Sequence, residues 1–103
     1  MRLPFPLLVL AGLLACAGPA RADMDLVIKK NCLACHQVDK RKYGPNFKEV
    51  AAKYADQKNA ADMLAKKIRR GGTGVWGPDV MPPQPQVSAK EALMLASYVL
   101  SLK

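Results

Sequence analysis

Apolar positions recur at helical spacing in two stretches of the chain. The first stretch contains Phe47, Val50, Ala51 and Tyr54. The second, near the C-terminus, contains Ala92, Leu95, Ala96, Val99 and Leu102. Because a helix turns once every 3.6 residues, each set lies on one helical face. The pattern predicts amphipathic helices, and no convincing strand alternation is found after residue 22.

Capping and breaking residues predict the other helix ends. Acidic residues at 23 and 25 precede Leu26, so we expect a first helix that starts near residue 23 and runs into Cys32. Asn59 is a candidate cap of a later helix that Gly71 and Gly72 stop. This helix has Met63, Leu64 and Ile68 on its apolar side and Lys66, Lys67, Arg69 and Arg70 in its final turns.

A capping box at Ser88 and Glu91 predicts the start of the last helix. Glycines and prolines interrupt residues 71–87, where we expect no regular element. The chain is therefore expected to be all-α.

The first 22 residues have the layout of a secretory signal peptide. Arg2 is followed by an apolar run, Leu7–Ala15, which is well short of the roughly 20 residues that span a bilayer. An A-x-A cleavage pattern ends at Ala22, which predicts a removed segment 1–22, a domain at 23–103 and export to the periplasm. Leu13–Cys16 also loosely resembles a lipobox, in which Cys16 would be lipidated.

The chain is basic, with 16 Lys and Arg against 8 Asp and Glu. Removal of residues 1–22 takes away two arginines and leaves a net charge near +6. Such a charge favours partners with acidic docking surfaces, although a merely soluble basic surface explains it equally well. Export and the lack of a nucleic-acid-binding motif argue against nucleic acid. We expect a monomer without stable membrane insertion.

Cys32, Cys35 and His36 form the C-x-x-C-H pattern of covalent haem attachment. Two thiols about one helical turn apart can bond neighbouring vinyl groups, and the adjacent imidazole then projects over the iron. A thioredoxin-like motif would follow a strand, a zinc site would need a fourth ligand, and a disulfide here would cross-link almost nothing. The sequence therefore predicts one covalently bound haem.

Met81 is the candidate for the other iron ligand. It lies outside the helical patterns and precedes two prolines, which forbid a helix and suit a loop that presents one side chain rigidly. Met24 precedes the haem motif on the same predicted helix, and Met63 and Met94 lie inside helical patterns, where Met usually fills the core. An ordinary surface Met in a loop is the alternative interpretation of Met81.

These motifs together resemble a small bacterial class I monohaem cytochrome c, over essentially all of residues 23–103. The segments that carry the resemblance are Cys32–His36, Tyr43–Pro45, Gly74–Pro78, Met81–Pro83 and the closing helix. The resemblance implies four to five helices around one haem, with the first and last helices crossing.

The resemblance also implies roles for single residues. Cys32 and Cys35 would be thioether anchors, and His36 and Met81 the axial iron ligands. The Pro45 carbonyl would accept the imidazole N–H, while Trp76 and Lys67 would lie near a haem propionate. Core packing is an equally good interpretation of Trp76, and a solvated helix face is the simpler one for Lys67. Residues 84–86 replace an Asn that often follows the two prolines in the family, which leaves the tuning of the Met sulfur open.

The predicted function is that of a periplasmic one-electron carrier between a respiratory-chain donor and a terminal reductase or oxidase. Because protein atoms would fill both axial positions, the iron would change by one electron without binding substrate. A haem enzyme or a gas or peroxide sensor with a labile sixth ligand is the alternative. A thiol oxidoreductase is a third hypothesis. We also expect the haem-free chain to be largely unfolded.

Overall fold

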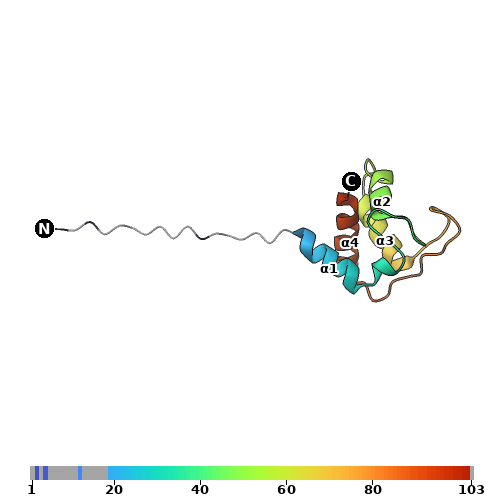
Figure 1. The fold of residues 1–103 in the computed structure, drawn as a ribbon, viewed down its shortest axis with the longest axis horizontal. Coiled ribbons are helices and arrows are strands. Elements are labelled where there is room, and N and C mark those ends of the chain that lie inside the picture. The colour runs from blue at the N-terminus through green and yellow to red at the C-terminus, as the bar shows by residue number, and fades with distance from the viewer. Residues whose placement is uncertain (1, 3, 5–11, 13–18, 103) are drawn as a thin grey trace.

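The computed structural model describes residues 2, 4, 12 and 19–102, and within them the chain is helical (Figure 1). Its elements are α1 (Pro19–Lys29), the 3-10 helix η1 (Cys32–Ala34), α2 (Phe47–Lys53), α3 (Ala60–Arg70) and α4 (Ala89–Ser101). The expected all-α class is confirmed. Most of the predicted apolar run of the signal peptide, and Cys16, lie outside the described residues.

Helix α4 is the element on which the others pack. Helices α1, α2 and α3 each contact it, and α1 crosses it (Figure 1). The predicted apolar stripe explains this, because Ala92, Leu95, Ala96 and Val99 are all buried. Val27 of α1 and Phe47 of α2 belong to the same core.

The bounds of the first helix differ from the prediction. It begins at Pro19, four residues early, where a proline fits because the first turn needs no N–H from it. It ends at Lys29 and does not run into Cys32. Asn31 adopts φ 64°, which stops the α-helix, and η1 follows. Asn is one of the few residues that enter this left-handed region readily.

Capping was predicted correctly at α4 and wrongly at α3. The Ser88 side chain accepts from Glu91 N, and the Glu91 carboxylate accepts from Ser88 N. Asn59 precedes α3 at φ 61°, and its side chain makes no capping hydrogen bond. A cap needs extended backbone to aim its side chain at the helix, and Asn59 is left-handed. Helix α2 has a complete capping box, between Asn46 and Glu49.

The segment between α3 and α4 contains one short piece of sheet geometry. Gly72 N donates to Met81 O at 3.0 Å and Met81 N to Gly72 O at 2.8 Å. The expectation of no regular element at 71–87 is confirmed, since no helix or strand is assigned between α3 and α4 and the bridge is isolated. The bridge attaches Met81 to the end of α3.

None of the helices described in the structure has the length and apolar content needed to cross a membrane.

Candidate functional site

A cavity of about 200 Å³ lies between the helices and the Met81 segment. Apolar side chains from four helices line it: Val27, Phe47, Val50, Leu64, Ile68, Leu95, Ala96 and Val99. Cys32, Cys35, His36 and Met81 border the same cavity. The fold therefore brings the four predicted haem-binding residues to one largely apolar space, although Met81 is far from the others in the sequence.

The two cysteines flank a single 3-10 turn. Cys35 N and His36 N both donate to Cys32 O, at 3.2 and 3.0 Å, which fixes the spacing of the motif. Cys32 and Cys35 form no disulfide with each other, and each is partly buried. Burial raises the pKa of the Cys32 thiol, and a backbone hydrogen bond opposes this shift. Cys32 is therefore a neutral thiol near neutral pH, which disfavours the reactive thiolate that an oxidoreductase needs.

His36 is fixed from two sides. Its Nδ1 lies 2.8 Å from the carbonyl oxygen of Pro45, the residue predicted to accept this hydrogen bond. The ring stacks on Phe47 with centroids 5.4 Å apart and an interplanar angle of 26°. Because a carbonyl only accepts, Nδ1 carries the proton and Nε2 keeps its lone pair free for a metal. Gly44 leaves room for the ring, since a side chain there would overlap it.

Met81 is distinguished by position from the other methionines of the described residues. Met24 accepts a weak hydrogen bond from the Tyr98 hydroxyl at 3.6 Å, and Met94 is 38% exposed. Met63 borders an outer hollow on α3. Only Met81 among these four borders the cavity that contains His36.

Trp76 and Lys67 both border the cavity, and their place near a propionate stays a prediction. Two basic residues that sequence reasoning missed hold Trp76 in place. Arg41 Nη2 donates to the Trp76 carbonyl at 3.2 Å, and Lys53 Nζ lies 5.5 Å from the centre of its ring. No local pattern could have revealed these contacts, because they join residues far apart in the chain.

The residues present fit a covalently bound haem. The two thiols suit covalent attachment to a porphyrin, and the imidazole with its free lone pair and the Met81 thioether suit binding of its iron. A zinc site fits less well, since in the part of the chain that the structure describes no three His, Cys, Asp or Glu residues are arranged so that they could hold one metal ion. The apolar lining matches the body of the macrocycle.

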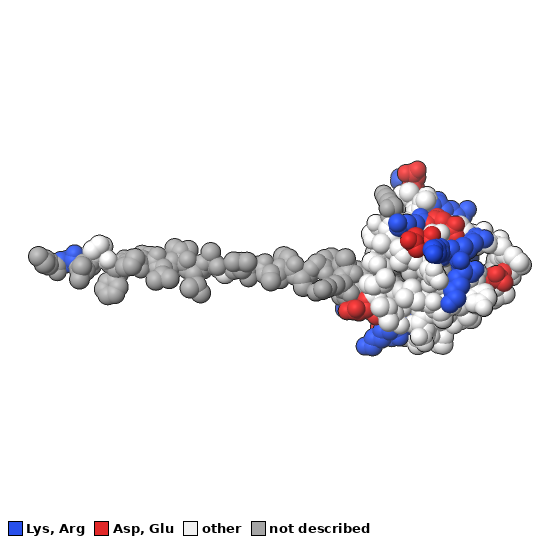
Figure 2. Space-filling view, in the orientation of Figure 1, with Lys and Arg blue, Asp and Glu red and all other residues white. Residues whose placement is uncertain are grey.

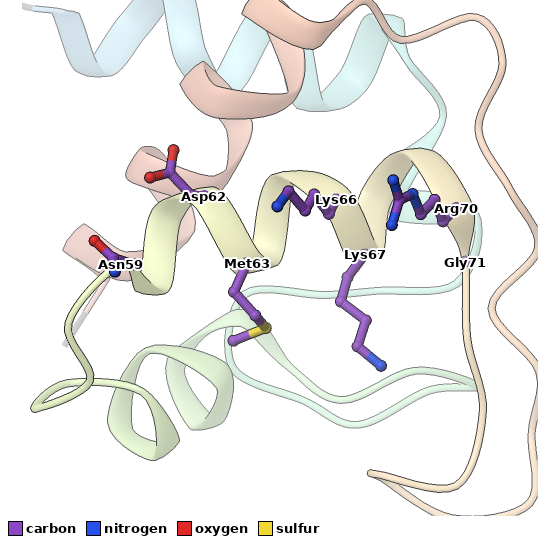
Figure 3. A pocket seen from close by; sticks show the side chains of 7 residues that line it. All are labelled: Asn59, Asp62, Met63, Lys66, Lys67, Arg70 and Gly71. Atoms are coloured by element: carbon purple, nitrogen blue, oxygen red, sulfur yellow. The ribbon is translucent and has the colours of Figure 1, made fainter.

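A second and more open hollow of about 580 Å³ lies along α3 (Figure 3). Asn59, Asp62, Met63, Lys66, Lys67, Arg70 and Gly71 line it. Lys67 and Met63 extend from the same side of the helix, and Lys67 also borders the cavity. The hollow carries three basic side chains and one acidic one, so it is a cationic surface adjoining the candidate haem site.

The comparisons with known proteins agree with this geometry. The family model described as cytochrome c matches residues 24–103. Cytochrome c-552 of Nitrosomonas europaea is 52% identical over 93 residues, which cover 90% of this chain and 90% of that protein. Cytochrome c-551 of Pseudomonas aeruginosa is 46% identical over 103 residues, which cover 97% of this chain and 98% of that protein.

A solved structure shows the same fold. The crystal structure of wild-type Nitrosomonas europaea cytochrome c552 aligns with a TM-score of 0.77 and 51% identity, covering 78% of this chain and 99% of that chain. These findings confirm the resemblance seen in the sequence and the expected cofactor, haem c with its iron. The chain therefore belongs to the cytochrome c family, among its small bacterial class I monohaem members.

Proposed function

We propose that this protein is a one-electron carrier in which Cys32 and Cys35 anchor the haem and His36 and Met81 bind its iron. The observation that carries the proposal is the convergence of all four side chains on one apolar cavity. The relatives are electron-carrying cytochromes, which supports the same function. When bound, the haem supplies a redox centre that accepts and releases single electrons.

The protein's residues would keep that centre closed to substrates. Pro45 holds the His36 proton on Nδ1, and Phe47 packs on the ring, so the imidazole is oriented before the iron is bound. The bridge to Gly72 holds the backbone of Met81. Because His36 and Met81 would both hold the iron, a gas or peroxide would have to displace one of them. Electron transfer therefore suits the site better than catalysis or sensing.

The spectrum of the holo-protein tests the ligand assignment. Wild type is expected to show the near-infrared band of Met-ligated ferric haem, and its ferrous form is expected to bind carbon monoxide poorly. Met81→Ala should lose the band and bind carbon monoxide readily, whereas Met94→Ala, at an exposed methionine, should leave both unchanged. A Met81→Ala protein with the wild-type spectrum and ligand binding would contradict the proposal.

The basic surface on α3 would guide docking to acidic redox partners. Four basic side chains, Lys66, Lys67, Arg69 and Arg70, occupy its last turns. The ion pairs found among the described residues, Lys30–Glu91 and Arg41–Glu49, use none of them. In the face shown in Figure 2, most of the visible Lys and Arg gather over the side where α2 and α3 lie. Positive charge beside the haem raises the encounter rate with anionic partners.

Ferricyanide, a small anionic oxidant, tests this steering directly. Lys66→Glu should slow oxidation of the ferrous protein at low ionic strength, and the difference from wild type should shrink as salt is added. Lys90→Glu makes the same charge change on α4, away from the hollow, and should have a smaller effect. Equal slowing by both variants would show that net charge acts, and not the α3 surface.

We also propose that the protein works in the periplasm, between a respiratory-chain donor and a terminal reductase or oxidase. The basic start, the apolar run and the A-x-A pattern at Ala22 support export. The mass of the exported holo-protein tests the cleavage site, since a product that starts at Asp23 is expected. A lipid-modified product that starts at Cys16 would overturn that assignment.

A further inference from the structure

A continuous set of polar contacts joins the segment after Met81 to the end of α1. The Gln84 amide nitrogen Nε2 donates to the Pro82 carbonyl at 2.9 Å. The Gln86 amide Nε2 donates to Gln84 Oε1 at 2.6 Å and to the Lys30 carbonyl at 3.3 Å. Lys30 Nζ returns a hydrogen bond to the Gln86 carbonyl at 2.9 Å. Hydrogen bonds thus link Pro82 to Gln84, Gln84 to Gln86 and Gln86 to Lys30.

These contacts connect the two parts of the chain that carry the proposed iron ligands. Lys30 lies two residues before Cys32, and Pro82 directly follows Met81. On its other side, Met81 is bonded to Gly72 through both backbone groups. The Met81 segment is therefore attached at both ends, to α3 before the ligand and to α1 after it.

Prolines make the second attachment effective at a distance. Pro82, Pro83 and Pro85 restrict the backbone between Met81 and Gln86, because each ring fixes φ near −65°. In a stiff segment, holding Gln86 in place also limits the movement of Met81, whereas a flexible segment would let Met81 move independently. Val87, which follows Gln86, is 2% exposed and anchors the segment in the core.

We propose that Gln86 and Lys30 are positioning residues that keep Met81 on the iron. In this proposal, their contacts lower the fraction of molecules in which Met81 has dissociated, and so protect the sixth position from external ligands. The inference rests on the proposed function, since it takes Met81 as an iron ligand.

A purely structural role for Lys30 is the competing explanation. Lys30 Nζ also forms an ion pair with Glu91 Oε2 at 3.2 Å, which ties α1 to α4. Glu91→Gln weakens this ion pair and leaves the contacts of Lys30 with Gln86 in place. This variant is therefore a matched control, which lowers stability but keeps the attachment of the Met81 segment to Lys30.

Imidazole binding to the ferric holo-protein measures release of Met81, because imidazole competes for the same position. Gln86→Ala should bind imidazole roughly three- to tenfold more tightly, the ratio expected from losing one or two hydrogen bonds. Of the contacts with Gln86, Lys30→Met removes only the bond from Nζ, because the Lys30 carbonyl still accepts from Gln86, and this variant should show a smaller gain together with a lower unfolding midpoint. Glu91→Gln should lower the midpoint but keep the wild-type imidazole affinity.

The outcomes separate this inference from the proposed function. Unchanged affinity in Gln86→Ala, or an equal gain in Glu91→Gln, would overturn the positioning role while leaving Met81 as the ligand. Met81→Ala has no side chain that competes with imidazole, so its imidazole affinity is the upper limit for the other variants. If Met81→Ala binds imidazole no better than wild type, the ligand assignment itself fails.

Discussion

Gly44 and Gly71 lie where a side chain would displace one of the proposed iron ligands. A Cβ atom on Gly44 would overlap the His36 imidazole. A Cβ atom on Gly71 would overlap the Met81 carbonyl oxygen and come within 2.8 Å of Pro83 N, and Gly71 has a φ of 72°. At both positions the proposed haem site imposes a steric requirement for glycine, and at Gly71 the positive φ adds a conformational one.

Gly71→Ala is expected to destabilise the holo-protein more than Gly74→Ala does. Both residues have positive φ, so alanine costs about 1 kcal/mol or more of backbone strain at each. Only Gly71 adds an overlap with the Met81 segment, since a Cβ atom on Gly74 meets nothing within 4 Å. Unfolding midpoints in urea measure the difference, and the near-infrared band should weaken in Gly71→Ala alone. If the two variants lose the same stability, the overlap with the Met81 segment contributes nothing to the effect of Gly71→Ala.

At the residue scale, the sequence predicted those site residues whose signal is local. Cys32, Cys35 and His36 form a compact motif, and two prolines mark the loop of Met81. The contact of Arg41 with the Trp76 carbonyl spans 35 positions, and that of Gln86 with Lys30 spans 56. Such pairs depend on how the helices pack, which no local pattern encodes.

At the scale of elements, helix ends were predictable where a side chain or a glycine decides them alone. Ser88 and Glu91 set the start of α4, and Gly71 ends α3. The prediction was wrong at Asn31 and Asn59, which both take positive φ. Asn suits an extended cap and a left-handed turn alike, so its identity does not choose between them.

The N-terminus of α4 makes stability depend on pH. The hydrogen bond from Ser88 N, followed by that from Lys30, lowers the pKa of the Glu91 carboxyl below its usual 4.5. A lowered folded pKa adds stability above the unfolded value, and this stability is lost as the pH falls through the folded value. Glu91→Gln should therefore be less stable than wild type at neutral pH, and the gap should close in acid.

Urea unfolding of the holo-protein across this pH range measures the gap. The Lys30→Met, Glu91→Gln double variant completes a mutant cycle, in which the coupling between the two residues should be present at neutral pH and absent well below the usual pKa of Glu91. A gap that stays constant over the whole range would mean that the Glu91 charge contributes nothing.

At the scale of the whole molecule, α4 is the common partner of α1, α2 and α3, and the cavity lies between these elements. The all-α class followed from the helical spacing of apolar residues. The sequence also predicted one bound haem, but the lining of its cavity depends on how the helices pack. Each helix contributes apolar side chains to this lining: Val27 from α1, Phe47 and Val50 from α2, Leu64 and Ile68 from α3, and Leu95 from α4. Much of the apolar surface of the helices therefore faces the cofactor.

The haem-free chain is expected to be largely unfolded for this reason. Without the macrocycle, the lining residues would face water or an empty space, and the apolar contacts that offset the entropy of folding in a chain this small would be lost. A Cys32→Ala, Cys35→Ala variant purified without haem should have a far-ultraviolet circular dichroism spectrum with little helix and no cooperative thermal transition. The holo-protein, measured alongside, should show both helix and a cooperative transition. A helical, cooperatively melting haem-free variant would mean that the core around α4 is sufficient to fold the chain, and that the cofactor only fills a site that is already formed.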